Sequence, residues 1–167
     1  MNPLDISPDA TSSHAAWVFR AWLLAVVPSL LYFVALAGVG ADALRPPGRA
    51  PDVAFAGYSI LAAPLLETAL MLALARLLEF MIPQRRRVRI VLLAAILSLA
   101  HRIGGGWHQV LASLWPFLIY SMVLTAWLAR SPRAAFVLTA LVHSLYNATL
   151  FGVGVLPLLL TVAAWGL

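Results

Sequence analysis

The sequence predicts an all-α protein, a polytopic transmembrane helical bundle of about six helices. Hydrophobic residues fill 63% of the 167 positions and charged residues only 10%, whereas a soluble domain carries about 25% charged residues. A soluble fold of this length buries only about 70% of its chain surface. The apolar surface left over must therefore face lipid, and the mean hydropathy of +0.94 agrees.

The lengths of the apolar segments also predict membrane spans. Proline, glycine and arginine divide the chain into apolar segments of about 15 to 27 residues, close to the roughly 20 residues that a helix needs to cross the hydrocarbon core. We expect residues 1–16 to form a polar tail rather than a signal peptide, because this segment has no arginine or lysine. Residues 17–167 then form a single transmembrane domain. The expected spans are 17–40, 53–80, 88–101, 107–129, 134–150 and 153–167.

The boundaries between these spans follow from residues that do not fit a helix in lipid. The segment 42–52 contains prolines and charged residues, so we expect a loop there. An arginine-rich turn at 84–89 precedes the third span, and the three glycines at 104–106 are expected to end it. The glycines within 151–154 are expected to separate the last two spans.

The charge pattern predicts contact with lipid and no binding of nucleic acid. The formal net charge of +5 comes from eleven arginines against six acidic residues, with no lysine. These arginines lie at the ends of apolar runs, where they act as topology signals and contact lipid headgroups. With six spans, eight arginines face one side and three the other, which predicts that both termini are cytoplasmic. We expect a multi-pass protein of a cell membrane, and the small size and the use of arginine without lysine are typical of a bacterial inner-membrane protein.

Four residues stand out among the polar residues inside the expected spans: Glu67, His101, His143 and Asn147. An ionisable side chain near the bilayer centre costs about 2.5–3.5 kcal/mol on insertion scales, so each one needs a reason. Counted from the arginine-rich ends of their spans, all four lie about 10 to 14 residues deep, which is roughly 15–21 Å. We therefore expect them to meet in one pocket. A carboxylate, two imidazoles and a carboxamide are the groups needed to activate water and to stabilise an oxyanion.

Each of these residues also has a purely structural interpretation. Glu67 can be a buried acid that hydrogen-bonds a neighbouring helix, and His101 can be an interfacial histidine. His143 and Asn147 are four residues apart and share a helix face with Thr139, so they can serve helix packing. Ser98, one turn before His101, can orient that ring.

The order and spacing of these residues resemble the CAAX protease and bacteriocin-processing enzyme family, intramembrane proteases related to the type II CAAX prenyl endopeptidase. The family pattern is E-E-x-x-x-R on one helix, F-x-x-x-H on the next and H-x-x-x-N two helices later. The corresponding residues here are Glu67, Thr68 and Leu72; Leu97 and His101; and His143 and Asn147. These motifs fall within residues 53–151, the expected core of the domain.

The resemblance implies a glutamate-dependent endopeptidase without a cofactor. Glu67, helped by His101, would activate a water, and His143 and Asn147 would stabilise the oxyanion. Thr68 replaces the second glutamate of the pattern and Leu72 the arginine, for which Arg76, one turn further on, is a candidate replacement. The favoured interpretation of Arg76 is that it pairs with Glu79, three residues away, or extends to the interface at the cytoplasmic end of the span. The implied substrate is a membrane-anchored or lipidated peptide, or the C-terminal anchor or sorting signal of a protein.

Alternatives to this function stay open at the level of the sequence. Glu67, His101 and His143 provide enough ligands for a zinc ion with an open position, although a metal-free mechanism is favoured by the resemblance and no H-E-x-x-H motif is present. The loss of two motif residues favours a non-catalytic member that binds peptides, confers immunity or acts as a scaffold. A small transporter or proton-relay subunit ranks last, because the sequence shows no internal repeat.

Overall fold

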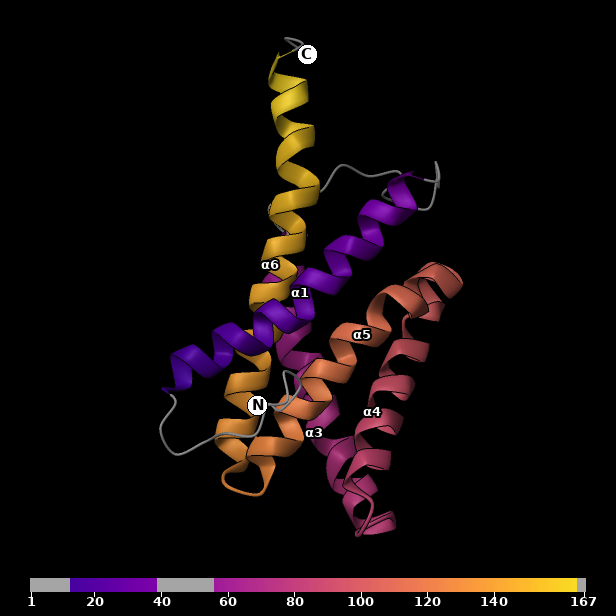
Figure 1. Cartoon of the computed structure of the whole chain (residues 1–167), viewed down its shortest axis with the longest axis vertical. Helices are drawn as coiled ribbons and strands as arrows, with labels where there is room; N and C mark the ends of the chain where they lie inside the picture. Colours follow the sequence, from indigo (N-terminus) through magenta and orange to yellow (C-terminus); the bar gives the residue numbers. More distant parts are fainter. Residues whose placement is uncertain (1–12, 39–55, 165–167) are drawn as a thin grey trace.

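The structure is a computed structural model that describes residues 13–38 and 56–164. Within these two ranges every element is helical, and Figure 1 shows their arrangement. The elements are α1 (His14–Gly38), the π-helical turn η2 (Tyr58–Ala62), α3 (Ala63–Met81), α4 (Arg86–Ala100), α5 (Arg102–Leu128) and α6 (Pro132–Ala164). The all-α prediction is confirmed for these residues. Most of the expected N-terminal tail and the expected loop at 42–52 lie outside the described residues.

Four segments of the described chain are long and apolar enough to cross a membrane, so six spans are not confirmed. These segments are His14–Ala35, Tyr58–Met81, Gly106–Leu128 and Pro132–Val153. Helix α4 has only 15 residues, and at about 1.5 Å per residue it is shorter than a hydrocarbon core of roughly 30 Å.

The expected break between a fifth and a sixth span is absent from α6, which continues through residues 151–154. A glycine in a helix costs only about 1 kcal/mol, whereas in an apolar medium a broken helix would leave backbone groups without partners. The expectation that both termini are cytoplasmic stays a prediction. In Figure 1, α1 begins in the lower half of the view and α6 ends at the top.

The expected break after the third span is confirmed, but it is divided between two positions. The chain turns at His101, between α4 and α5. Gly106 then interrupts α5 with a φ of 74°, a left-handed conformation that glycine adopts without a steric penalty. The long apolar part of α5 starts at this residue.

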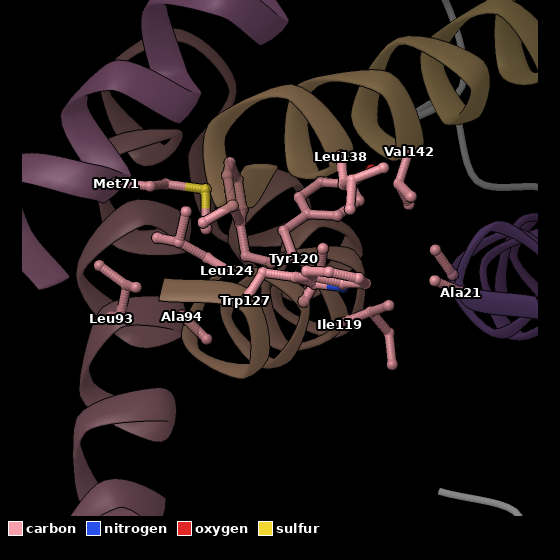
Figure 2. Packing of buried hydrophobic residues seen from close by; sticks show 14 of the residues in the cluster. Ala21, Met71, Leu93, Ala94, Ile119, Tyr120, Leu124, Trp127, Leu138 and Val142 are labelled. Carbon is pink, nitrogen blue, oxygen red and sulfur yellow. The ribbon is translucent and has the colours of Figure 1, made fainter. Parts of the chain in front are cut away.

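The core of the bundle forms around α5, as Figure 2 shows. Tyr120 and Leu124 of α5 lie among side chains of the neighbouring helices, including Met71 of α3 and Val142 of α6. All four are almost completely buried. Close packing of this kind holds membrane helices together, because lipid supplies little hydrophobic driving force.

Two tryptophans attach α1 to the rest of the bundle by hydrogen bonds. The indole Nε1 of Trp22 donates to the hydroxyl of Thr149 in α6 at 3.2 Å, and that of Trp115 in α5 donates to the carbonyl oxygen of Leu24 at 2.7 Å. The outer surface, in contrast, is apolar: Phe80 and Ile103 are 86% and 93% exposed. Such a surface is suited to lipid and supports the assignment as a membrane protein.

Candidate functional site

The antiparallel course of α3, α4 and α6 brings three of the expected residues into contact distance. Glu67 lies in α3, His101 directly follows α4, and His143 lies in α6. The Oε1 atom of Glu67 is 4.0 Å from Nε2 of His101, and its Oε2 atom is 3.6 Å from Nε2 of His143. Together with Asn147, these residues line one cavity of 160 Å³. The four residues predicted to share a pocket therefore do so.

The ring of His101 is oriented by the backbone of its own helix. Its Nδ1 atom lies 3.0 Å from the carbonyl oxygen of Leu97. A carbonyl oxygen only accepts hydrogen bonds, so we assign the hydrogen to Nδ1. In the neutral ring Nε2 is then an acceptor, and it faces the carboxylate of Glu67. Ser98, which was expected to orient this ring, has a buried hydroxyl without a hydrogen-bond partner among the described residues.

The ring of His143 is held by aromatic side chains of α5. Tyr120 stacks on it with ring centroids 4.4 Å apart and an interplanar angle of 27°, and Phe117 meets it edge to face at 5.8 Å. The Nδ1 atom is buried without a partner in the described part of the chain. Because Nε2 faces a carboxylate, which accepts hydrogen bonds, we assign the hydrogen to Nε2. His143 therefore presents a donor to the cavity, whereas His101 presents an acceptor.

Asn147 is positioned by a backbone carbonyl group of η2 that has no hydrogen-bond partner within its own helix. Its Nδ2 atom donates to the carbonyl oxygen of Ser59 at 2.8 Å. That oxygen is available because the N–H of Ala63 bonds instead to Tyr58, and the residue five positions after Ser59, Pro64, has no N–H to offer in π-helical register. The amide of Asn147 carries a second N–H, which is left for a ligand in the cavity.

This geometry places an acceptor, Nε2 of His101, near one oxygen of the Glu67 carboxylate and a donor, Nε2 of His143, near the other oxygen. The lone pairs of Glu67 and of His101 Nε2 face each other across 4.0 Å, a distance too long for a direct hydrogen bond. A water that donates one hydrogen to each group satisfies both, and it is thereby polarised for attack. The donors of His143 and Asn147 border the same space. The arrangement can therefore activate water and stabilise a negative charge next to it.

The residues expected to support the site lie around it without joining its hydrogen bonds. Thr68 and Thr139 are completely buried, and neither hydroxyl has a partner among residues 13–38 and 56–164. Leu72 packs against the apolar core. Arg76 pairs with Glu79 at 2.8 Å, with half of its side chain exposed, and it lies nine positions along α3 from Glu67, about 13 Å at the rise of a helix.

The metal alternative has no pre-formed site in the described residues. No group of three or more His, Cys, Asp or Glu side chains in this part of the chain is arranged to hold a metal ion. A zinc site would need nitrogen and oxygen ligands about 2.0–2.2 Å from one point, so His101, His143 and Glu67 would have to draw together around the ion.

The sequence interpretation missed the aromatic and backbone parts of the site. Tyr120 and Phe117 are three residues apart in α5, and this spacing on one helix face was the available signal. Pro64 was a second signal, because a proline inside a span leaves a carbonyl group that a neighbouring helix must satisfy. Nothing in the sequence showed that Asn147 would supply that donor.

Comparison with known proteins identifies no relative. No family model matches the chain, and neither the curated proteins nor the solved structures contain a match.

Proposed function

We propose that this protein is a glutamate-dependent intramembrane endopeptidase similar to the CAAX protease and bacteriocin-processing enzymes. Its substrates would be membrane-anchored or lipidated peptides, or the C-terminal anchors and sorting signals of proteins. One observation carries this proposal. The carboxylate of Glu67 lies 4.0 Å from the imidazole of His101, at the junction of α4 and α5, and 3.6 Å from that of His143 in α6, at the wall of a cavity inside a bundle of apolar helices.

In this mechanism, Glu67 is the general base. It removes a proton from the water held against His101, and the resulting hydroxide attacks the carbonyl carbon of the scissile peptide bond. When the carbon–nitrogen bond breaks, Glu67 returns the proton to the departing amine, so the carboxylate is regenerated. His101 Nε2 accepts a hydrogen bond from the second hydrogen of the water. This keeps the lone pair of the water oxygen directed at the carbonyl carbon of the substrate.

His143 and Asn147 bind the oxyanion of the tetrahedral intermediate. His143 offers Nε2–H, and Asn147 offers the amide hydrogen that Ser59 does not use. Donors that are fixed before the reaction stabilise developing charge without the cost of reorganisation, and the low dielectric of the cavity strengthens the effect. The stacked ring of Tyr120 and the carbonyl group of Ser59 provide this fixation.

The departures from the family pattern leave these four residues in place. Leu97 replaces a phenylalanine, but its backbone carbonyl group orients His101. A backbone carbonyl group is present at this position whichever side chain it carries. We propose that Thr68 and Leu72 serve packing here, because both side chains lie in or against the core. Arg76 is too far along α3 to serve Glu67. The mechanism uses no metal or other cofactor.

We place the protein in a bacterial inner membrane, with the arginine-rich end of the bundle in the cytoplasm. The ends of α3 and α5 and the starts of α4 and α6 carry Arg85, Arg86, Arg87, Arg89, Arg130 and Arg133. Cytoplasmic loops carry an excess of positive residues. The start of α1 lies at the same end, because His14 and Trp17 contact Trp127 near the end of α5, and we place the N-terminus in the cytoplasm as well.

The substitution Glu67→Gln tests the proposal. The amide keeps the shape of the side chain but cannot accept the proton, so we expect peptide cleavage to fall by about 10²–10⁴-fold. The membrane peptides of cells that produce the wild-type protein or Glu67→Gln would be compared by mass spectrometry for new termini. Arg76→Gln is the matched control, because it removes a charge from the same helix outside the cavity. Cleavage products that persist with Glu67→Gln would exclude Glu67 as the base.

The same experiment distinguishes a proteolytic enzyme from the second candidate function, a non-catalytic peptide-binding protein of the same family. The absence of the second glutamate and of the arginine, at Thr68 and Leu72, favours this second candidate. It predicts that the wild-type protein and Glu67→Gln purify with the same uncut membrane peptides, and that neither produces new termini.

A further inference from the structure

A second cavity, of 300 Å³, lies at the arginine-rich end of the bundle. It is bordered by the end of α3, the start of α4 and the end of α5. The charged residues that line it are Arg86, Arg89, Arg130 and Glu79. The proposed proteolytic mechanism uses none of them, and three guanidinium groups against one carboxylate favour an anionic ligand.

Among the described residues, one carboxylate lines this cavity, and it is already paired. Glu79 accepts a hydrogen bond from Arg76 at 2.8 Å, and Arg76 itself is not among the lining residues. The negative charge of Glu79 is therefore offset from outside the cavity by Arg76, so Glu79 does not draw on the charge of Arg86 or Arg89.

Arg89 is fixed in a position that suits a ligand. Its Nη1 atom donates to the carbonyl oxygens of Ile82 and Pro83 in the turn between α3 and α4, at 3.0 and 2.5 Å. A guanidinium group has five N–H donors, so the hydrogens on Nη2 and Nε remain for another acceptor. Arg86 is the first residue of α4, where the positive end of the helix dipole adds to its charge.

The surroundings of this cavity indicate a lipid as the source of the anion. Beside the arginines, its lining is largely apolar and includes Ala75, Leu93 and Leu128. The cavity also lies at the end of the membrane-spanning helices, where lipid headgroups are expected. Basic pockets between membrane helices on the cytoplasmic side are known to bind anionic headgroups.

We propose that this cavity binds the phosphate group of an anionic membrane lipid. Guanidinium groups bind phosphate through parallel N–H donors and with permanent charge, and both features are present at Arg86 and Arg89. The site is separate from Glu67 and does not depend on the proteolytic function.

The test uses the full-length protein, purified in detergent, with phosphatidylglycerol as the anionic lipid, phosphatidylcholine as the zwitterionic control and inorganic phosphate as the soluble control. Native mass spectrometry counts the retained lipids, and thermal unfolding reports stabilisation. We expect one retained phosphatidylglycerol and an increase in Tm, with no comparable effect of phosphatidylcholine. If inorganic phosphate raises the Tm and phosphatidylglycerol does not, the lipid is excluded as the source.

Two neighbouring arginines supply a matched pair of variants. Arg86→Gln removes a lining charge, whereas Arg87→Gln removes the same charge from the adjacent residue, which does not line the cavity. We expect Arg86→Gln to weaken phosphatidylglycerol binding roughly fivefold, from about 1 kcal/mol per arginine at a membrane surface, and Arg87→Gln to change it much less. The double variant Arg86→Gln/Arg130→Gln should bind more weakly still. Equal weakening by Arg86→Gln and Arg87→Gln would show a diffuse effect of surface charge and overturn the site.

Discussion

The central cavity and the arginine-lined cavity of this bundle differ in the kind of charge that they contain. The central cavity holds Glu67, His101 and His143, which can all exist in a neutral form, and the carboxylate oxygens of Glu67 lie 4.0 Å from Nε2 of His101 and 3.6 Å from Nε2 of His143. The other cavity holds permanently charged guanidinium groups at the end of the helices. A charge that cannot be neutralised is costly at the bilayer centre but tolerated near the headgroups, so position along the helix selects the residue type.

The two cavities also differ in what holds their side chains. The rings and the amide of the central cavity are fixed by short-range contacts with Tyr120, Leu97 and Ser59. In the other cavity Arg89 is held by two backbone carbonyl groups, but Arg86 and Arg130 are exposed. We therefore expect the cleavage rate at the central cavity to fall even with substitutions that keep the net charge. Lipid binding at the arginine-lined cavity should instead depend on substitutions that change the charge.

Apart from Glu67→Gln, the largest effect should come from the proposed oxyanion donors. His143→Ala and Asn147→Ala should each reduce the cleavage rate by about 10²–10³-fold, the usual cost of a missing oxyanion donor, although Asn147→Ala leaves the net charge unchanged. Residues that act as a unit are strongly non-additive, so the double variant should be little slower than either single one. Rates measured on a substrate identified from the membrane peptides would check this. Losses that multiply in the double variant would show that the two residues act separately.

A smaller effect should follow from the ring that stacks on His143. Tyr120→Leu removes a stacking interaction of about 0.5–1.5 kcal/mol, so we expect kcat to fall by up to roughly tenfold with KM nearly unchanged. Tyr120→Phe keeps the ring and loses only a hydroxyl without a partner in the described chain, so it should cleave at close to the wild-type rate. If the two variants are equally slow, the hydroxyl and not the stacking is what matters.

The smallest effect should distinguish the two cavities by their response to salt. Raising the ionic strength from 0.1 to 1 M shortens the Debye length from about 10 to about 3 Å. Phosphatidylglycerol binding at the exposed arginines should weaken severalfold, whereas the cleavage rate should stay nearly constant because the central groups are shielded by the bundle. Parallel titrations of lipid binding and cleavage would measure both. A cleavage rate that falls together with lipid binding would show that the cavities are coupled.

The depth of the central site was predicted from the sequence by counting residues from the span ends and multiplying by the rise of a helix. Glu67, His101, His143 and Asn147 lie at similar distances from arginine-marked ends, and each residue adds about 1.5 Å along the axis. Depth is a local property of each span, so it did not require knowledge of the packing. The same reasoning failed for α6, because the glycines within 151–154 were read as a boundary although a helix in lipid keeps its hydrogen bonds across them.

The contacts within the site depended on the tertiary structure. The rotation of each helix about its axis decides which ring nitrogen faces Glu67 and which aromatic side chain stacks on His143, and this rotation is set by packing among residues far apart in the sequence. The pairing of Asn147 with Ser59, 88 positions apart, is of the same kind.

The sequence by itself determined that this is an all-α protein with an apolar, lipid-compatible surface and a layer of polar groups in its interior, because composition and axial distance are properties of single segments. Only the tertiary structure decided that the carboxylate of Glu67 lies between an acceptor and a donor, and that Arg86, Arg89 and Arg130 surround one cavity. These arrangements depend on how helices rotate and pack against one another, and that choice is made jointly by contacts across the whole bundle.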